Sequence, residues 1–404
     1  MKRNRKLAII GTVGLPANYG GFETLAAHLV ENLDSEYDIT VYCSGKKYAK
    51  EERKTHYKNA KLKFLPLNAN GIQSIFYDAF SILHSLFYAD VLLILGVAGA
   101  FMLPFVRLFT NKKIIISIDG IEWKRDKWNL LAKAYLFWAE GLAVKYSHID
   151  ISDNESIQDY TALRYKSLSR VIEYGADHTL NVKPTEKHQE EFTFLKKAYA
   201  FKVCRIEPEN NVHTVLEAFA ALQKYTLVIV GNWNNSKYGQ NLRITYKNYD
   251  NIILLDPIYN QEKLDTIRGN AFLYVHGHSA GGTNPSLVEA MYLGLPIFSF
   301  KVSYNLTTTE NKAKYFTDTE TLKELITSTS FAALKEMGDS LEAIAKRRYV
   351  WSLIADKYRK LIQETYTAKS KTPVLAKISQ LNQQSLSELN LQHLVHTEKF
   401  YKNI

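Results

Sequence analysis

Two adjacent glycines, Gly281 and Gly282, stand between an apolar run and a short helical pattern. The run 271–275 is typical of a buried strand, and Thr283 or Asn284 followed by a proline is typical of a helix start. Glycine lets a backbone approach a ligand closely, and the free N–H groups and dipole of a helix N-terminus favour an anion. The stretch therefore predicts a binding site for a nucleotide phosphate.

The helix that follows these glycines also carries an acidic residue. Glu289 lies about one turn into it, where its carboxylate is placed to accept hydrogen bonds from ligand hydroxyls. An ordinary strand-to-helix turn with a solvated glutamate would produce the same local pattern. The pattern alone therefore leaves both interpretations open.

A second glycine-rich loop follows the first apolar run, residues 7–10. Its glycines lie at positions 11, 14, 20 and 21, so it lacks the G-x-G-x-x-G spacing of dinucleotide-binding folds. The pair Gly20 and Gly21 nevertheless opens a helical pattern over residues 22–33. That arrangement suits a close backbone approach by phosphate.

Apolar runs separated by helical patterns recur along the whole chain. Strands are expected at 7–10, 39–43, 62–65, 91–95, 114–118, 148–151, 170–172, 199–204, 226–230, 252–255, 272–275 and 297–300. Helices are expected at 22–33, 73–87, 127–146, 154–164, 212–222, 261–269, 285–293, 321–328, 331–345 and 351–366. Such alternation predicts parallel sheets with helices on both faces.

The elements group into two Rossmann-like, doubly wound α/β domains. We expect the first over residues 1–180 and the second over 198–348, because the chain turns polar between 177 and 197. A helix at 349–366 is expected to pack back on the first domain, and the polar tail 367–404 carries no chemical motif. Two such domains predict a cleft where the carboxyl ends of their strands face each other.

Composition limits the class of protein. A chain of 404 residues, 46% of them hydrophobic, has material for two buried cores, and Cys43 and Cys204 are typical of core thiols in a reducing compartment. The uncharged run 91–106 is shorter than the roughly 20 residues that a membrane span needs. The basic N-terminus imitates a signal peptide, but Gly11 and Gly14 interrupt its apolar region. We expect a cytoplasmic protein.

The formal charge of +10 indicates an anionic partner. The basic residues are dispersed and no nucleic-acid motif is present, which disfavours nucleic acid. An anionic membrane surface or a pyrophosphate-bearing lipid fits the charge, and so does a basic surface that has no specific partner.

Four stretches of the sequence, 14–24, 119–128, 281–291 and 304–310, together resemble the GT-B glycosyltransferases. Within that group they are similar to a retaining branch, and more narrowly to the rhamnosyltransferases of bacterial capsule and cell-wall polysaccharide assembly (the β-1,4-rhamnosyltransferase type). The matching stretches spread over about three hundred residues and both domains. The first two are specific to the narrow group, and the third is shared more widely.

The resemblance implies a nucleotide-sugar donor held mainly by the second domain. Relatives carry a Glu-x7-Glu word; Glu289 matches its second glutamate, and Gly281 replaces the first. Arg205 matches an arginine that holds the diphosphate, whereas Asn210 stands where a lysine is expected. The diphosphate charge would then rest on Arg205 and the backbone N–H groups of residues 281–286.

Charged residues of the first domain complete the expected site. Asp119 follows a strand and is the best candidate to meet the sugar or the acceptor, with helix capping as the alternative. Glu122, Lys124 and Arg125 lie just beyond it and are expected to bind the acceptor, unless they are surface charges. Glu23 either contributes to the site or is a first-turn carboxylate favoured by the helix dipole.

His276 and His278 flank a glycine and invite a zinc interpretation. No cysteine or third histidine lies at a suitable spacing, so we expect contact with the donor instead, and neither a metal nor a cofactor. The expected reaction residues are Asp119 and Arg205, and the expected substrate-binding residues are Gly20, Gly21, Glu122, Lys124, Arg125, His276, His278, Gly281, Gly282, Thr283, Asn284, Ser286 and Glu289.

The resemblance implies transfer of L-rhamnose from dTDP-L-rhamnose, with retention, onto a lipid-pyrophosphate-linked saccharide at the inner face of the plasma membrane. In a front-face mechanism the diphosphate helps to deprotonate the acceptor, and no protein nucleophile is required. Three alternatives stay open: a transferase using a UDP- or GDP-linked sugar, a nucleotide-sugar epimerase of the same architecture, and a non-catalytic assembly scaffold.

Overall fold

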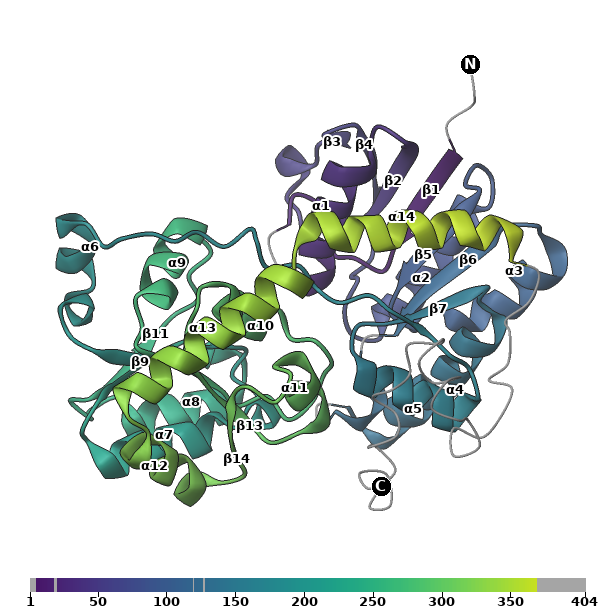
Figure 1. The fold of residues 1–404 in the computed structure, drawn as a ribbon. Helices are drawn as coiled ribbons and strands as arrows, with labels where there is room; N and C mark the ends of the chain where they lie inside the picture. The colour runs from purple at the N-terminus through teal and green to yellow at the C-terminus, as the bar shows by residue number, and fades with distance from the viewer. Residues whose placement is uncertain (1–4, 18–19, 119, 126–127, 369–404) are drawn as a thin grey trace. The chain divides into compact units, whose positions relative to one another are not determined.

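The computed structural model describes residues 5–17, 20–118, 120–125 and 128–368, and the chain divides into two compact units (Figure 1). Unit 1 runs to Glu173 and resumes at Ser352, and unit 2 is Tyr174–Trp351. Unit 1 thus ends before residue 180, where the sequence predicts the end of the first domain. The polar stretch 177–197 belongs to unit 2, and it contains α6 (Glu186–Glu191) and a short 3-10 turn, η4 (Thr193–Lys196).

Hydrogen bonds explain why the boundary lies this early. The Ala176 N–H donates to the carbonyl of Tyr349 at 2.7 Å, and the Asp177 carboxylate accepts from the Trp351 N–H at 2.7 Å. The two ends of unit 2 are therefore attached to each other just beyond Glu173.

Unit 1 is built on an eight-stranded sheet of order β3-β4-β2-β1-β5-β6-β7-β8, parallel except for the β3–β4 pair. Its strands are β1 (Arg5–Ile10), β2 (Tyr37–Ser44), β3 (His56–Tyr57), β4 (Ala60–Leu65), β5 (Val91–Leu95), β6 (Lys113–Ile118), β7 (Ile149–Ser152) and β8 (Arg170–Val171). The central strands are buried on both faces, which is why they are continuous apolar runs.

Helices cover both faces of this sheet. They are α1 (Gly21–Leu33), α2 (Gln73–Ser85), α3 (Leu103–Phe109), α4 (Leu130–Tyr146), α5 (Glu155–Tyr165) and α14 (Trp351–Thr367), with 3-10 turns η1 (Lys50–Glu52), η2 (Ala100–Met102) and η3 (Glu122–Lys124). The chain steps outward from β1 through α1 and then back across the sheet through α2 and α3. Right-handed crossovers therefore place α2, α3 and α4 on the face opposite α1.

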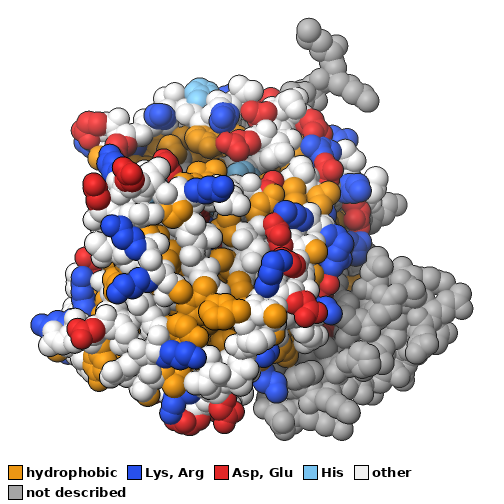
Figure 2. All heavy atoms as spheres, turned by 60° about the vertical axis from the view of Figure 1, so that its left-hand side comes forward, with side chains coloured by type: hydrophobic (Ala, Val, Ile, Leu, Met, Phe, Trp, Pro, Cys, Tyr) orange, Lys and Arg blue, Asp and Glu red, His pale blue; other side chains and the backbone are white. Residues whose placement is uncertain are grey.

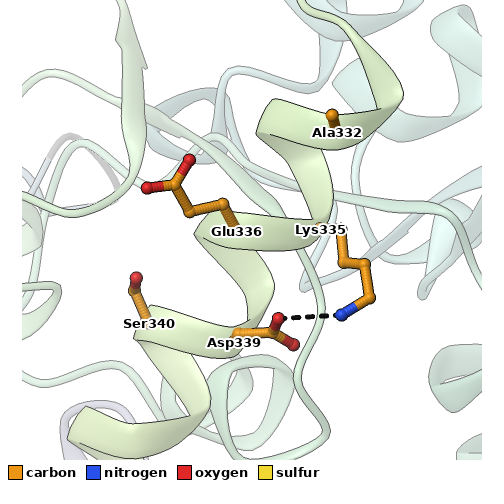
Figure 3. A pocket seen from close by; sticks show the side chains of 5 residues that line it. All are labelled: Ala332, Lys335, Glu336, Asp339 and Ser340. Carbon is orange, nitrogen blue, oxygen red and sulfur yellow. Dashed lines mark hydrogen bonds and ion pairs between the residues drawn. The ribbon is translucent and has the colours of Figure 1, made fainter.

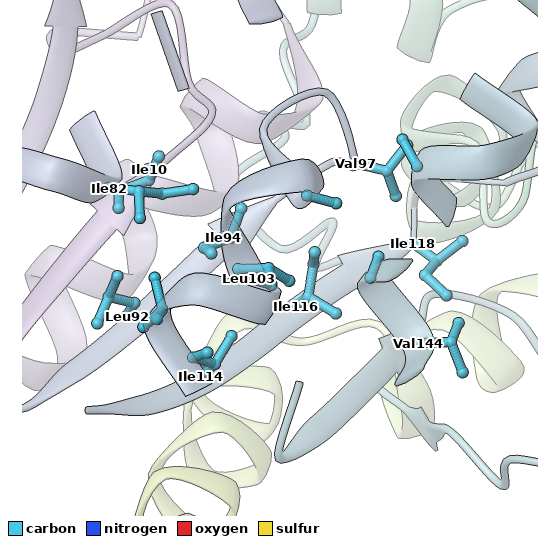
Figure 4. Packing of buried hydrophobic residues seen from close by; sticks show 14 of the residues in the cluster. Ile10, Ile82, Leu92, Ile94, Val97, Leu103, Ile114, Ile116, Ile118 and Val144 are labelled. Atoms are coloured by element: carbon cyan, nitrogen blue, oxygen red, sulfur yellow. The ribbon is translucent and has the colours of Figure 1, made fainter. Parts of the chain in front are cut away.

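The main core of unit 1 lies between the sheet and these helices (Figure 4). Ile82 of α2, Leu103 of α3 and Val144 of α4 belong to one buried cluster with β-strand residues such as Ile94 and Ile116. Burial of such β-branched and leucine side chains contributes about 1.5–3 kcal/mol each. This packing fixes the three helices against the sheet.

Helix α14 is attached to unit 1 by charged contacts. Arg359 donates to the Glu36 carboxylate at 2.7 Å, Arg170 contacts Glu364 at 2.5 Å, and the Arg5 guanidinium lies 3.5 Å from the centre of the Tyr366 ring. The first of these joins α14 to the turn between α1 and β2, and the others join it to β8 and β1.

Unit 2 contains a six-stranded parallel sheet of order β11-β10-β9-β12-β13-β14. Its strands are β9 (Tyr199–Val203), β10 (Thr226–Val230), β11 (Ile252–Leu255), β12 (Leu273–His276), β13 (Ile297–Phe300) and β14 (Lys314–Phe316). Its other helices are α7 (Val212–Leu222), α8 (Lys237–Tyr246), α9 (Gln261–Gly269), α10 (Pro285–Tyr292), α11 (Ser303–Thr308), α12 (Thr319–Ser328) and α13 (Phe331–Arg348), with 3-10 turns η5 (Pro208–Asn210) and η6 (Trp233–Asn235).

The predicted fold class, two Rossmann-like α/β units with parallel sheets, is confirmed. Among the described residues, no helix has both the length and the hydropathy that a membrane span requires. On the face drawn in Figure 2, lysine and arginine side chains are interspersed with acidic ones, so the net positive charge is not gathered into one block there.

Truncation of a central core residue should destabilise unit 1. Ile116 is fully buried in β6, and Ile116→Ala should lower the free energy of unfolding by about 2–5 kcal/mol because the cavity cannot close completely. Urea unfolding followed by circular dichroism measures the change. Ile244→Ala, at a well-exposed position of α8, should stay within about 0.5 kcal/mol of wild type. Equal effects of the two substitutions would contradict the assigned core.

Candidate functional site

Most of the predicted site residues of unit 2 lie at one edge of its sheet. Strand β9 pairs in parallel with β12, so the segments that leave their carboxyl ends emerge side by side. Arg205 follows β9, His276 ends β12, and the loop 277–284 leads from β12 to α10. In doubly wound sheets this edge is where ligands bind.

Side-chain amides hold these two loops in place. Asn211 donates from Nδ2 to the carbonyl of Gly277 at 2.9 Å, and Asn305 donates to the carbonyl of His278 at 3.0 Å. The Ser279 N–H donates to the carbonyl of Glu209 at 2.8 Å. The loop after β12 is thus tied to the loop after β9 and to α11, which preorganises the edge.

The first turn of α10 does not present the bare N–H groups that the sequence suggested. Asn284 caps the helix: its Oδ1 accepts from the Ser286 N–H at 3.1 Å and from the Ser286 hydroxyl at 2.8 Å. The N–H groups of Leu287 and Val288 both donate to the Asn284 carbonyl, and Pro285 has no N–H. The expectation of free amides within this turn is therefore wrong, because an asparagine N-cap satisfies them.

Of the glycine pair before the helix, Gly281 leaves room for the close approach of a ligand that the sequence predicts. Gly281 has a backbone φ of +138°, which residues with a side chain rarely adopt. No atom lies within 4 Å of the position that a Cβ would occupy there. Gly282 and Thr283 are buried behind it. A ligand can therefore approach the backbone at Gly281 closely.

Glu289 is held by two neighbours. One carboxylate oxygen contacts the Arg268 guanidinium, and the other lies 3.2 Å from Nε2 of His178. Arg268 is fully buried and also contacts the carboxylate of Asp265. A ribose hydroxyl bound to Glu289, as the sequence predicts, would share the carboxylate with Arg268, through which the carboxylate already joins α10 to α9.

The charge state of Glu289 follows from this network. Burial is the largest single influence on this carboxyl and by itself would raise its pKa, but the Arg268 guanidinium and His178 together outweigh burial and lower the pKa to about 2. Glu289 is therefore ionised at neutral pH and compensates the buried positive charge of Arg268.

Arg205 is available to a ligand. Its side chain is 56% exposed, and its nearest acidic partner is Glu207 at 3.8 Å. The turn behind it is closed by Asn210, whose Nδ2 donates to the Arg205 carbonyl at 2.6 Å. Asn210 thus shapes the turn and brings no positive charge.

Lys202 is a candidate that the sequence reasoning missed. It lies in β9, is fully buried, and its Nζ has no hydrogen-bond partner among the described residues. A Cβ added at Gly277 would stand 2.8 Å from this Nζ and 2.4 Å from the carbonyl oxygen of Asn210. The ammonium therefore lies where the loops after β9 and β12 meet. A lysine inside an otherwise apolar strand was the available signal.

Burial lowers the pKa of Lys202, and lowers that of His276 well below its ordinary value, with Lys202 adding to the effect on His276. The His276 imidazole is fully buried, and neither ring nitrogen has a hydrogen-bond partner in the part of the chain that is described. It stacks on the ring of His278, with centroids 4.3 Å apart and planes at 14°. Each buried polar group left unsatisfied costs roughly 1–3 kcal/mol, so such groups point to a polar ligand or to water.

In unit 1 the glycine pair Gly20 and Gly21 begins α1, with Gly20 as an exposed N-cap in extended conformation. Glu23 is buried, and its carboxylate accepts the Val13 N–H at 2.5 Å. Glu23 is thereby fixed to the preceding loop and supports its conformation.

The acidic and basic residues after β6 contact one another. Glu122 accepts from the Trp128 indole at 3.0 Å and pairs with Arg125 at 2.8 Å, and the Lys124 Nζ lies 5.6 Å from the centre of the Trp123 ring. Burial lowers the pKa of Lys124, and nearby Arg164 lowers it further. Asp119 lies outside the described residues.

One surface depression lies away from all of these residues. Ala332, Lys335, Glu336, Asp339 and Ser340 of α13 line it, and Lys335 and Asp339 form an ion pair at 3.0 Å (Figure 3). Because the residues that line it all come from one helix, no loops converge there, and we assign it no function. In the described ranges, no group of three or more His, Cys, Asp and Glu side chains is arranged to hold a metal ion.

Comparison with protein families divides the chain in the same way as its fold. Residues 4–177 match a family described as a domain of unknown function (DUF1972), and residues 184–347 match the family "Glycosyl transferases group 1". No sequence among curated proteins matches the chain significantly.

Solved structures share the whole architecture. A sucrose-phosphate synthase from Thermosynechococcus elongatus is 15% identical with a TM-score of 0.74, over 91% of this chain and 100% of that one. A glycosyltransferase from Rickettsia africae is 12% identical with a TM-score of 0.68, and the match covers 91% of this chain and 100% of that one. The Anabaena protein HepE, solved in complex with UDP and glucose, is 12% identical with a TM-score of 0.65, and the match covers 90% of this chain and 100% of that one. The chain therefore has the GT-B fold, and the match of residues 184–347 to the group 1 family supports a glycosyltransferase.

Removal of the Glu289 charge should destabilise unit 2. Glu289→Gln leaves Arg268 buried with a single acidic partner, which should cost about 3 kcal/mol at neutral pH. The folded-state pKa of Glu289, about 2, lies below its ordinary value of 4.5, so its stabilisation is present above pH 4.5 and is lost as the pH falls toward 2.

The stability difference between wild type and Glu289→Gln should accordingly shrink as the pH falls from 4.5 toward 2. Thermal unfolding followed by circular dichroism at several pH values measures it, and the comparison cancels the titration of other carboxyls. Glu342→Gln, at a partly exposed ion pair of α13, is the matched control and should change little. A difference that is independent of pH would contradict the role assigned to Glu289.

Proposed function

We propose that the protein transfers a sugar from a nucleotide diphosphate, most specifically L-rhamnose from dTDP-L-rhamnose, onto a lipid-pyrophosphate-linked saccharide with retention of anomeric configuration. One observation supports the binding of a nucleotide-sugar donor. Two buried groups without hydrogen-bond partners among the described residues, Lys202 and His276, lie at the same sheet edge as the exposed Arg205. The sugar and the acceptor are taken from the sequence stretches 14–24, 119–128 and 304–310.

The proposed chemistry needs a stabilised leaving group. The bond between the anomeric carbon and the diphosphate oxygen breaks, and negative charge develops on the diphosphate. The exposed Arg205 side chain and the buried Lys202 ammonium would both stabilise this negative charge. Lys202 would supply the positive charge that Asn210 lacks. Groups fixed before the reaction need no reorganisation as the charge develops.

His276 and the glycine pair would orient the donor. The lowered pKa of His276 keeps its ring neutral, so one ring nitrogen can donate a hydrogen bond and the other can accept one. Gly281 leaves open space for the donor beside the backbone. The acceptor hydroxyl would give its proton to a diphosphate oxygen as its own oxygen bonds to the anomeric carbon, so no protein nucleophile is needed. We expect neither a metal nor a cofactor.

A donor panel tests the proposal directly. The purified protein is incubated with dTDP-rhamnose, UDP-glucose, UDP-N-acetylglucosamine and GDP-mannose, with and without lipid extract as the acceptor source, and nucleotide diphosphate release is measured. We expect release from dTDP-rhamnose that depends on the lipid extract. Release from a UDP- or GDP-sugar instead would replace the proposed donor.

The same panel separates the other activities. Epimerised sugar that forms without acceptor would favour an epimerase. Thermal stabilisation by a nucleotide sugar without turnover in any mixture would favour a non-catalytic protein. Either result would overturn the proposed transfer.

Replacement of the buried lysine should separate donor binding from folding. Lys202→Met keeps most of the length of the side chain but removes its charge. It should weaken binding of a nucleoside diphosphate by about ten- to a hundredfold, the range expected when a hydrogen bond to a charged group is lost. Without ligand the variant should be as stable as wild type or more stable, because a buried unpaired charge is replaced by an apolar group.

Isothermal titration with dTDP and thermal unfolding measure the two quantities. Lys224→Met, an exposed position after α7, is the control and should match wild type in both. Unchanged dTDP affinity in Lys202→Met would remove Lys202 from the site, while a loss of stability in the absence of ligand would give it a structural role.

A further inference from the structure

Helix α2 exposes a continuous apolar stripe. Phe76, Phe80 and Leu83 of the helix, with Ile72 just before it and Phe87 in the turn just after it, recur at intervals of three or four residues and are all exposed, Phe87 to 90%. This spacing places them on one side of the helix, whereas the opposite side, including Tyr77 and Ile82, packs into the core. The helix is therefore apolar on both its core side and its solvent side.

Two neighbouring helices repeat this pattern. Phe105, Leu108 and Phe109 are exposed on α3. The corresponding exposed residues of α4 and its start are Leu130, Leu131, Phe137 and Trp138, with Leu130 at 85%. On each helix the intervals again correspond to a single side. Exposed apolar residues that occur singly are ordinary, but several adjoining stripes are not.

The three stripes lie on one face of unit 1. The buried sides of α2, α3 and α4 belong to the same core cluster and rest on the same face of the sheet, and α3 packs directly against α4 (Figure 4). Their exposed sides consequently point to the same side of the unit. We call the twelve exposed residues on these helices the apolar face.

Within α2, α3 and α4, the charged side chains that reach the surface are all basic. Within α2, α3 and α4 the acidic residues are Asp78 and Glu140, and both are buried. Of the basic residues there, Lys145 is exposed and Lys133 is partly exposed, whereas Arg107 is partly buried and contacts the His148 imidazole. The exposed surface of these helices is thus apolar and basic, in contrast to the mixed charges of the face in Figure 2.

We propose that the apolar face docks on the surface of an anionic lipid bilayer. Aromatic and leucine side chains would enter the boundary between headgroups and acyl chains, while the basic residues would meet anionic headgroups. A second copy of the chain would bring basic residues opposite basic residues, which is unfavourable. The proposal requires no spanning helix and is independent of the donor chemistry, since it concerns unit 1 alone.

Vesicle flotation tests the proposal. The full-length protein is mixed with vesicles of phosphatidylcholine containing one third phosphatidylglycerol, and with vesicles of phosphatidylcholine alone, at low and high salt. We expect binding to the anionic vesicles that weakens with salt. Phe87→Ser combined with Leu131→Ser should reduce the partition coefficient by about tenfold or more, because two large apolar side chains no longer enter the bilayer.

The control is Ile244→Ser combined with Tyr259→Ser, two exposed apolar positions of unit 2, which should bind like wild type. Circular dichroism verifies that both variants fold. Failure of the wild type to bind anionic vesicles, or an equal loss of binding in both variants, would overturn the proposal. So would self-association of the wild type that Phe87→Ser with Leu131→Ser abolishes without altering lipid binding, because the face would then join two copies.

Nucleotide release from the donor, measured on the same variants with a water-soluble acceptor analogue, keeps this test separate from the proposed function. Turnover should be unchanged in Phe87→Ser with Leu131→Ser, whose positions lie outside the donor site. Loss of vesicle binding with retained turnover supports the docking face, whereas loss of both in a folded variant would contradict its independence from the site.

Discussion

The cost of burying a polar group without a partner governs the carboxyl edge of the second sheet. Lys202 Nζ and both ring nitrogens of His276 are enclosed by packed strands and by loops that Asn211 and Asn305 hold closed. A protein normally pairs such groups, and leaving several of them unsatisfied at one place consumes a noticeable part of a folding free energy of about 5–15 kcal/mol. An anionic ligand at this edge would offset that cost on binding. The edge is therefore less stable than it would be if these groups were paired.

In the neighbouring network, by contrast, the buried cation Arg268 is paired with acidic side chains. Arg268 is as deeply buried as Lys202, but Asp265 and Glu289 neutralise it, so it stabilises the arrangement of α9 and α10. The two cations thus differ in their partners: Arg268 has two acidic partners, whereas the Lys202 ammonium has no hydrogen-bond partner among the described residues. This contrast also changes the interpretation of Glu289. A conspicuous glutamate in a motif can act by fixing the helix that bears it, and a ligand contact then depends on the lone pairs that remain.

Periodicity in the sequence was sufficient for the fold because the parallel strands are buried on both faces and hence apolar throughout, as in β5 and β6. It failed for α8, α11 and β14, whose few buried residues leave little pattern. At the site, glycines and the N-cap Asn284 were readable because each has a local backbone reason. Lys202 gave only a weak signal, because a lysine in a strand is normally exposed, and only the tertiary structure shows that this one is enclosed. The pairing of Glu289 with Arg268 and His178 likewise depends on contacts between residues far apart in the sequence.

A lipid-linked saccharide imposes two physical demands on the protein that modifies it. Its sugar must reach a polar, charge-stabilised site, and its lipid remains in a bilayer, so the protein has to work at the membrane surface. Under the proposed function these demands would fall on different units, because the cationic edge belongs to unit 2 and the apolar face belongs to unit 1. An apolar face of this extent would be an aggregation hazard for a protein that stays in bulk water. It becomes useful when an anionic bilayer covers it, because the same side chains that would cause aggregation then supply the free energy of docking.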